Sequence, residues 1–337
     1  MIKKSAYNVA VVGVTGAVGA MFLQILEERT FPINNLIPLA SANSVGKKVV
    51  FKEKTYQVEE LTEDSFKNVD IALFSAGSER SAAFAPCAVK SGAVVIDNSS
   101  AFRMDKNVPL VIPEINPLDL PKHNGIIANP NCTTIIMLLP VKPLYDYSKI
   151  TRIVVSSYQS ASGAGAKAMK ELIDQAKAFA LGEPLVNSVF PHPLLFNLIP
   201  HVDSFLENGY TKEEMKMFNE TRKILSDDQI AVSATCVRVP VLSSHSEAVT
   251  VHSEKKITVD KARQLLSNAR GVKLLDSPKE RLYPMPINAS DQDLAIVGRI
   301  REDISDENSL TFWVSGDQLR KGAAVNAVQI AELLIKS

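Results

Sequence analysis

The stretch Val9-Ala-Val-Val-Gly13-Val-Thr-Gly16-Ala-Val-Gly19 decides how the N-terminal part of the chain is expected to fold. Its apolar run, residues 9–14, is typical of a strand buried on both faces of a parallel sheet. A helical pattern follows directly over residues 17–29. Glycines at such a turn let the backbone approach a pyrophosphate, which the N–H groups of the helix N-terminus then bind. The spacing G-x-x-G-x-x-G is a variant of the usual motif, and a glycine turn without a ligand is the alternative.

The same alternation continues through the first 130 residues. Short apolar runs at 36–40, 71–75, 94–97 and 126–128 predict further strands, and residues 79–90 predict a second crossover helix. Such βαβ units form a Rossmann-like, doubly wound parallel sheet, which places this part in the α/β class. Residues 47–58 alternate polar and apolar side chains and predict a hairpin.

After Asn131 the pattern changes to long strands with separate helices, which predicts an α+β domain on a mixed or antiparallel sheet. Expected helices are 133–142, 166–181 and 212–225, and expected strands are 152–159, 234–241, 247–253, 295–302 and 310–315. A final helix, 322–336, has one apolar face.

Composition excludes several classes of protein. The 337 residues suggest about two domains. The 37 basic and 37 acidic residues balance, so no overall positive charge favours nucleic acid or an anionic membrane. Three cysteines without a Cys-x-x-Cys pair argue against disulfides and a cysteine zinc site, and no metal is expected. Without a signal peptide or a long apolar run, we expect a soluble, cytoplasmic protein.

The residues after the predicted second strand indicate the cofactor. That strand ends at Ala40, where an NAD enzyme usually carries Asp or Glu for the ribose hydroxyls. Residues 41–48 contain no acid but do contain serines and two lysines. Because hydroxyls and cations suit a 2′-phosphate, NADP is preferred to NAD.

Cys132 lies in Asn129-Pro-Asn131-Cys132-Thr-Thr, where a strand ends and an apolar helix begins. A helix N-terminus favours the thiolate and can hold an oxyanion, so Cys132 is the candidate nucleophile. Cys87 and Cys236 are interpreted as ordinary buried cysteines.

Three further segments carry candidate site residues. Arg238 lies in an apolar strand and needs a buried anionic partner, and His245 in a serine-rich turn is a candidate general base. His252 is seven residues further on, so a regular strand would point the two rings to opposite faces.

Arg103 is a candidate anion binder, although a solvated arginine is an equal alternative. The small residues at 159–166 form either a functional loop or a merely flexible one.

With these residues in view, the sequence resembles aspartate-semialdehyde dehydrogenase, in the compact version found in many Gram-positive bacteria. Seven motifs occur in the family's order, namely Gly13–Gly19, Ser99–Arg103, Asn129–Thr134, Gln159–Gly165, Glu213–Lys216, Arg238–His245 and Gly316–Leu319. The resemblance implies a homodimer with an NADP-binding domain of residues 1–130 plus 317–337 and a catalytic and dimerisation domain of residues 131–316.

The resemblance also implies the reaction and the roles of residues. L-Aspartyl-4-phosphate would be reduced with NADPH to L-aspartate 4-semialdehyde and inorganic phosphate, through a cysteine thioester, in lysine, methionine and threonine biosynthesis. The catalytic residues would be Cys132, His245 and Gln159. Substrate and phosphate would be bound by Arg103, Asn131, Glu213, Lys216 and Arg238, with Arg238 on the α-carboxylate. The cofactor would be bound by Gly13, Thr15, Gly16, Ala17, Val18, Gly19, Ser41, Ala42, Ser44, Ser162, Gly163 and Gln318.

One departure and three alternatives stay open, the weakest alternative being a phosphorylating aldehyde dehydrogenase of the glyceraldehyde-3-phosphate type. Many relatives carry Arg where this chain has Asn43, which bears on the strength of the NADP preference. N-Acetyl-glutamyl-phosphate reductase shares the fold and the Cys/His chemistry, but its motif usually has Gly before the cysteine, where this chain has Asn131. An inactive nucleotide-binding homologue would not need to keep Cys132, Gln159, Arg238 and His245 together.

Overall fold

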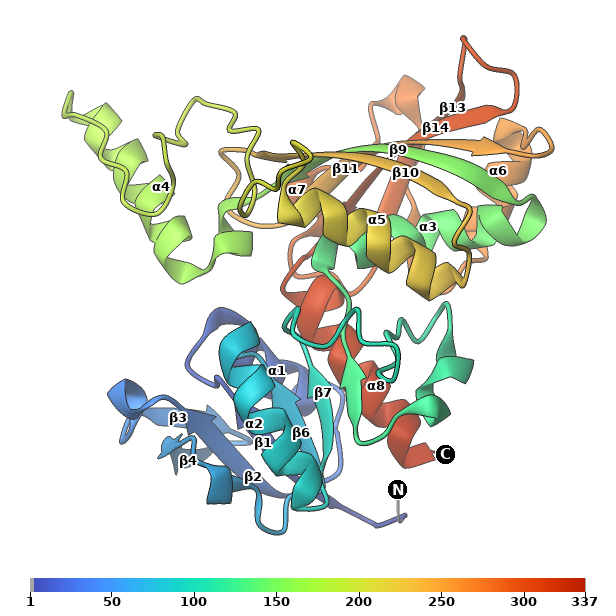
Figure 1. Ribbon diagram of the computed structural model, residues 1–337. Helices are drawn as coiled ribbons and strands as arrows, with labels where there is room; N and C mark the ends of the chain where they lie inside the picture. Colours follow the sequence, from blue (N-terminus) through green and yellow to red (C-terminus); the bar gives the residue numbers. More distant parts are fainter. Residues whose placement is uncertain (1–2, 337) are drawn as a thin grey trace. The chain divides into compact units, whose positions relative to one another are not determined.

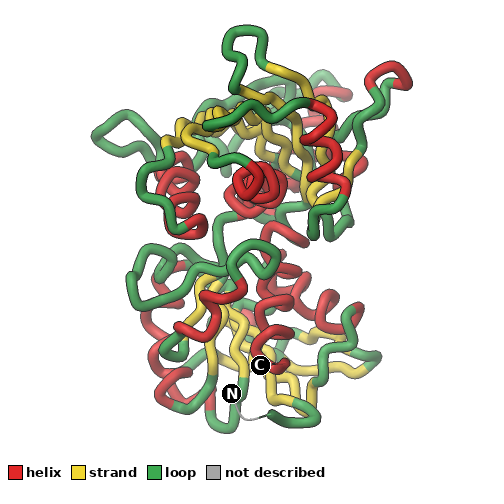
Figure 2. Tube along the Cα trace, turned by 90° about the vertical axis from the view of Figure 1, so that its right-hand side faces the viewer, coloured by secondary structure: helices red, strands yellow, loops and turns green. Residues whose placement is uncertain are grey.

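The computed structural model describes residues 3–336, which form two compact units (Figure 1, Figure 2). The first unit runs up to Asn131 and resumes at Ala323, and the second is Cys132–Gly322. The later boundary lies at Gly322 rather than at the predicted residue 316. Residues 317–322 make their contacts inside the second unit, where the Arg320 guanidinium pairs with Asp293 at 2.7 Å.

The first unit contains the predicted doubly wound parallel sheet. Its six strands are all parallel, in the order β5-β2-β1-β6-β7-β8. They are β1 (Tyr7–Val12), β2 (Ile33–Ala40), β5 (Glu59–Glu60), β6 (Ile71–Phe74), β7 (Val94–Asp97) and β8 (Ile126–Ala128). The predicted hairpin is the antiparallel pair β3 (Lys48–Phe51) and β4 (Lys54–Gln57).

Helices cover both faces of this sheet because its strands are apolar on both sides. One core cluster joins the sheet to α1 (Ala17–Glu28) and α8 (Val325–Lys336), and another joins it to α2 (Ser78–Lys90). Asn326 of α8 donates hydrogen bonds to the Val111 carbonyl and the Asn129 side chain. The C-terminal helix is therefore part of the first unit.

The first strand ends two residues earlier than predicted, at Val12 rather than Val14. Gly13 has a positive φ of 84°, and a Cβ there would lie 2.3 Å from the Ser75 carbonyl oxygen. The chain leaves the sheet at Gly13 because the turn requires a residue without a side chain.

The second unit is built on a six-stranded mixed sheet, in the order β10-β9-β11-β14-β13-β12. Helices α3, α5 and α6 contact one face of it (Figure 1). The strands are β9 (Ile150–Gln159), β10 (Ala231–Arg238), β11 (His245–Ser253), β12 (Val272–Leu274), β13 (Ala295–Glu302) and β14 (Ser309–Gly316). The helices are α3 (Cys132–Tyr147), α4 (Ala166–Ala180), α5 (Lys212–Leu225), α6 (Val259–Ser267) and α7 (Pro286–Ala289).

Several details differ from the sequence-based expectation. The strand predicted over 234–241 is β10, which ends at Arg238, because Pro240 has no N–H to continue the ladder. Helix α6 and strand β12 were not predicted, since both are short. Short 3₁₀ turns occupy Ala42–Ser44, Glu63–Phe66, Pro117–Lys122, Ala161–Ala164 and Pro278–Glu280, and a π-helical turn spans Arg320–Ala324.

Candidate active site

The glycine turn of the first unit forms one wall of a cavity of about 200 Å³ at the ends of β1 and β2. A side chain at Gly19 would place its Cβ 2.1 Å from the Gly13 carbonyl oxygen, so this glycine lets α1 pack closely on the strand. Ala17 and Val18 form the first turn of α1. A glycine cradle facing a helix N-terminus fits a dinucleotide pyrophosphate. The cavity is lined by Gly13, Thr15, Gly16, Ala40, Ser41, Leu61, Ser75, Ala76 and Arg80.

Of the residues expected after the second strand, Ser41 lines this cavity and Ala42 is exposed. Ser44 is buried, and its hydroxyl lies 3.3 Å from the Thr15 hydroxyl, so it connects the loop to the glycine turn. Arg80, in the first turns of α2, was not found from the sequence. No sequence motif relates the position of Arg80 to the glycines. The residue comes close to them only because the sheet brings α2 beside β1.

Two residues expected to bind substrate or phosphate also belong to the first unit. Arg103 is buried and donates a hydrogen bond to the Asn98 carbonyl at 2.9 Å. Asn131 is buried at the end of the unit, directly before the nucleophile candidate. Nearby, the Asn129 side chain donates to the Asn98 side chain at 2.6 Å, which ties the loops after β7 and β8 together.

Cys132 is the first residue of α3, as its sequence context predicted to within one residue. The thiol is partly exposed, whereas the helix that follows is almost entirely buried. Gly322 lies against it, and a Cβ on Gly322 would be 2.8 Å from the Cys132 Cβ. The nucleophile candidate therefore stands at a helix N-terminus, beside a residue that leaves room for it.

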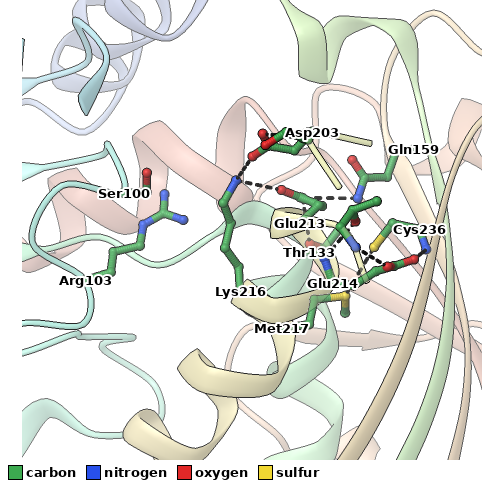
Figure 3. A network of polar contacts seen from close by, with 12 residues as sticks. Ser100, Arg103, Thr133, Gln159, Asp203, Glu213, Glu214, Lys216, Met217 and Cys236 are labelled. Atoms are coloured by element: carbon green, nitrogen blue, oxygen red, sulfur yellow. Dashed lines mark hydrogen bonds and ion pairs between the residues drawn. The ribbon is translucent and has the colours of Figure 1, made fainter. Parts of the chain in front are cut away.

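Helix α5 presents Glu213 and Lys216 on one face (Figure 3). A capping box fixes the start of the helix, because Thr211 and Glu214 each accept the other's main-chain N–H. The Lys216 ammonium pairs with Glu213 at 3.0 Å and with Asp203 at 2.8 Å. Burial disfavours this ammonium, but the two carboxylates outweigh burial and raise the pKa of Lys216 above its usual value.

Asp203 was not expected from the sequence, because it reaches Lys216 from a loop thirteen residues away. Glu213 is more deeply buried than Lys216. Its carboxylate also accepts hydrogen bonds from the Gln159 amide at 3.2 Å and the Thr133 hydroxyl at 3.4 Å (Figure 3). The network thus joins α3, α5 and β9 at one end of the sheet.

Gln159, Arg238 and His245 lie at the same end of three adjacent strands. Arg238 and Gln159 are direct register partners, and β11 pairs Ser246 with Tyr158 on the other side of β9. The expected buried anionic partner of Arg238 is present only as a nearby charge, that of the buried Glu213, and not as a direct ion pair. The Arg238 side chain donates to the Ser160 carbonyl at 2.7 Å, and no carboxylate of residues 3–336 lies within ion-pair distance.

The surroundings of the Arg238 guanidinium lower its pKa on balance, because burial outweighs the nearby negative charges. Burial lowers its pKa, while the negative charges of Glu213 and of the Cys132 thiolate act in the opposite sense. By the same interaction, Arg238 favours the thiolate form of Cys132. The site therefore combines the candidate nucleophile Cys132 with the buried guanidinium of Arg238, which forms no ion pair with a carboxylate among residues 3–336.

His245 is completely buried, and burial together with the Arg238 charge lowers its pKa to about 3. The ring is neutral at pH 7. The main-chain N–H of Ser160 donates to its Nδ1 at 3.1 Å, so the neutral ring carries its proton on Nε2. Among residues 3–336, Nε2 has no hydrogen-bond partner. The imidazole is thus ready to donate to a bound group.

The small-residue loop after β9 packs directly on these side chains. A Cβ on Gly163 would lie 2.9 Å from both Arg238 Nη1 and His245 Cε1. The Ser162 hydroxyl accepts a hydrogen bond from the Gln318 amide at 2.5 Å, and Gln318 in turn accepts from the Ser244 N–H at 2.8 Å. Gly163 therefore has no room for a side chain, and the loop packs against two of the candidate site residues.

Cys236 and His252 fit the interpretations given to them, whereas Cys87 is half-buried rather than buried as expected. Cys236 is buried, and burial together with Glu213 raises the pKa of its thiol. Cys87 lies on α2, where its thiol donates to the Ala83 carbonyl. His252 pairs with Asp306 on the other face of β11, as the seven-residue spacing predicted.

Glu247 also lies on the catalytic face of β11, two residues after His245, and was not expected from the sequence. It is completely buried, and burial together with the Glu213 charge raises its pKa well above the usual value. Neither a helix able to span a membrane nor a metal-binding cluster of His, Cys, Asp or Glu was found over residues 3–336.

In a comparison with known protein families, two family models match this chain. Residues 8–123 match the semialdehyde dehydrogenase NAD-binding domain, and residues 141–321 match the semialdehyde dehydrogenase dimerisation domain. Among curated proteins, the chain is 55% identical to the aspartate-semialdehyde dehydrogenase of Aquifex aeolicus over 98% of both chains. It is 49% identical to that of Bacillus subtilis, over 98% of this chain and 97% of the relative.

Among solved structures, aspartate semialdehyde dehydrogenase II of Vibrio cholerae, described as complexed with ASA, superposes with a TM-score of 0.96 at 46% identity. The match covers 99% of both chains. The fold, the geometry of the site and the near-complete coverage of the relatives all indicate the same family. The chain belongs to the aspartate-semialdehyde dehydrogenase family, oxidoreductases that act on an aldehyde group with a nicotinamide cofactor.

Proposed function

We propose that the chain reduces L-aspartyl-4-phosphate with NADPH to L-aspartate 4-semialdehyde and inorganic phosphate. One observation carries the proposal. Cys132 begins a helix within the electrostatic reach of Arg238, a buried cation without a carboxylate partner among the described residues. A nucleophile near a guanidinium that forms no ion pair with a carboxylate suits an acyl substrate that brings its own carboxylate.

In this scheme the Cys132 thiolate attacks the acyl phosphate carbon. The C–S bond forms as the C–O bond to phosphate breaks, which leaves a thioester and releases phosphate. The helix N-terminus and Arg238 both favour the thiolate. The thiol proton leaves to solvent, and the negative charge of Glu213 favours uptake of a proton by the His245 ring, which then carries a proton on both nitrogens.

The nicotinamide, when bound, supplies the hydride that reduces the thioester carbonyl. His245 Nε2 then gives its proton to the resulting oxyanion. The Ser160 hydroxyl, 3.1 Å from Nδ1, can accept the Nδ1–H of the imidazolium form. Collapse of the thiohemiacetal breaks the C–S bond, releases the aldehyde and returns the proton to the Cys132–His245 pair. Gln159, held against Glu213, orients the acyl group.

Substrate recognition is divided between the charged residues around this pair. Arg238 binds the α-carboxylate, where a planar fork suits bidentate hydrogen bonding. Glu213 binds the amine, and its position between Lys216 and Gln159 supports this role. Arg103, Asn131 and Lys216 bind the phosphate.

We further propose NADP rather than NAD as the cofactor, with Ser162, Gly163 and Gln318 on the nicotinamide side. The cavity at the glycine turn supports NADP, because its lining contains Ser41 and Arg80 but no carboxylate. Arg80 supplies a cation for the 2′-phosphate, whereas Asn43, at the position where many relatives carry Arg, is neutral.

We also propose a homodimer. One face of the second sheet lies under α3, α5 and α6, while its other face carries the Tyr158 and Trp313 rings, which contact each other at a tilt with their centroids 5.2 Å apart. A cavity of about 370 Å³ opens beside Trp313. The match of this unit to a dimerisation domain supports a second copy as the partner.

The experiment is a spectrophotometric assay at about 340 nm with phosphate, NADP and L-aspartate 4-semialdehyde, which follows the hydride transferred in the reverse direction. We expect phosphate-dependent formation of NADPH. N-Acetyl-glutamate semialdehyde serves as the comparison substrate. A higher kcat/KM for that compound, or no turnover of either aldehyde, would contradict the proposal.

A further inference from the structure

The structure assigns to Phe190 and the segment Val186–Ile199 the task of positioning Arg238 for the substrate carboxylate. This inference rests on the proposed function, because it concerns how the same site recognises its substrate. The segment follows α4 and carries none of the residues placed in the site so far. It nevertheless constrains Arg238 in two ways.

The first constraint acts on the Arg238 backbone. Ile199 and Arg238 form an isolated antiparallel bridge, in which the Ile199 N–H donates at 3.0 Å and the Arg238 N–H at 2.8 Å. The segment is thus bonded through its backbone to β10 at the residue that carries the guanidinium.

The second constraint acts on the guanidinium itself. The Phe190 ring is buried, and the Arg238 Cζ lies 5.7 Å from its centroid. This distance falls within the range of a cation–π contact, which is stronger where water is excluded. With Nη1 held by the Ser160 carbonyl, the ring restricts the remaining rotation of the fork. A bidentate carboxylate contact depends on that orientation.

Helix α4 holds the segment in place. The Glu171 carboxylate accepts from the main-chain N–H groups of Ser188 at 2.5 Å, Val189 at 2.6 Å and Phe190 at 3.4 Å. One turn later, Gln175 accepts from the N–H groups of Leu194 and Leu195 at 3.0 and 2.9 Å. Glu171 stays charged, because these hydrogen bonds outweigh the effect of burial and lower its pKa. A buried anion with three N–H donors is a firm anchor for Phe190.

The test measures KM for L-aspartate 4-semialdehyde, KM for NADP and kcat in purified full-length variants. Phe190→Leu removes the ring but keeps an apolar side chain. We expect its KM for the aldehyde to rise about 3- to 30-fold, with kcat and KM for NADP within about 2-fold of wild type. Phe190→Tyr keeps the ring face and should restore the wild-type KM.

Three further variants separate positioning from general damage. Phe179→Leu is the matched control, because that ring lies on α4 outside the segment, is 58% exposed and makes an edge-on ring contact with Phe196 instead of Arg238. Its KM should not change. Arg238→Lys should itself raise KM for the aldehyde, and adding Phe190→Leu to it should cost less than about 2-fold more, since the two residues act through one contact. Glu171→Gln should raise the same KM without lowering kcat.

Several results would overturn the inference. They are an unchanged KM in Phe190→Leu, a Phe190→Tyr enzyme as impaired as the leucine variant, or losses that multiply in the double variant. If Phe190→Leu is too unstable to assay, an unchanged KM in Glu171→Gln overturns it equally. Absence of turnover in the wild type, by contrast, would refute the proposed function rather than this inference.

Discussion

Arg80 and Asn43 are the residues on which cofactor choice is expected to depend. Arg80 lines the cavity beside Ser41, whereas Asn43 is exposed on a 3₁₀ turn. A guanidinium–phosphate contact is worth about 1.5–3 kcal/mol. Arg80→Ala should therefore weaken NADP binding about 10- to 100-fold and leave NAD binding unchanged, as measured by calorimetry on the free enzyme.

The compensating variant adds Asn43→Arg to Arg80→Ala. It should recover much of the lost NADP affinity, because the cation returns to the loop after β2. Equal weakening of NADP and NAD in Arg80→Ala would show that Arg80 does not read the 2′-phosphate.

His245 should make the stability of the fold depend on pH. Its pKa is about 3 in the folded protein, because of burial and the Arg238 charge, against about 6.5 when unfolded. As the pH falls below 6.5, the unfolded chain takes up a proton that the folded chain does not. The free energy of unfolding therefore decreases, by up to about 1.4 kcal/mol per pH unit from this residue alone.

The measurement is denaturant unfolding of wild type and His245→Asn between about pH 7.5 and pH 4. The variant should lose less stability over this range, since asparagine does not titrate. Parallel curves for the two proteins would contradict the assignment of a neutral, buried imidazole. The same variant should keep its covalent path and lose about 10²–10⁴-fold in kcat.

At the scale of elements, the turn that precedes α8 packs closely against the start of α3. Gly322 leaves room for Cys132, and a methyl group there would be 2.8 Å from the cysteine Cβ. Gly322→Ala should therefore displace the nucleophile and lower kcat at least about tenfold. Thermal unfolding and NADP binding should stay close to wild type. An unchanged kcat would show that the thiol tolerates the shift.

Local patterns explain which elements could be predicted. The glycine turn before α1, the apolar start of α3 and the run of small residues after β9 each carry a signal within a few residues. Asp203, Phe190 and Arg80 carry none, because loops or neighbouring strands bring them to the site from distant positions. Their roles depend on tertiary contacts, which no local periodicity encodes.

At the scale of the whole molecule, we expect the face of the second sheet that carries Tyr158 and Trp313 to be buried against a second copy of the chain. Sedimentation of the wild type should give twice the mass of the chain. Trp313→Glu places a charge beside the Tyr158 ring and should shift the protein towards monomer. Leu118→Glu is the control, since this residue is 86% exposed in the first unit. A monomeric wild type, or identical behaviour of the two variants, would contradict the dimer.

The domain arrangement shows a similar limit of sequence reasoning. The return of the C-terminal helix to the first unit was implied by the family resemblance and not by composition. In the structure, Asn326 and the Arg29–Glu332 pair at 2.8 Å tie α8 to that unit. The boundary at Gly322 follows from Asp317, which accepts the N–H groups of Leu319 and Arg320 inside the second unit.

The most direct test of the proposed chemistry is to trap the acyl-enzyme and find the cysteine that carries it. The enzyme is mixed with NADP and L-aspartate 4-semialdehyde without phosphate, quenched in acid and digested for mass spectrometry. We expect the aspartyl adduct on Cys132, and a Cys132→Ala enzyme that binds NADP but forms no adduct and has no turnover. An adduct on Cys87 or Cys236, or substantial activity in Cys132→Ala, would contradict the mechanism.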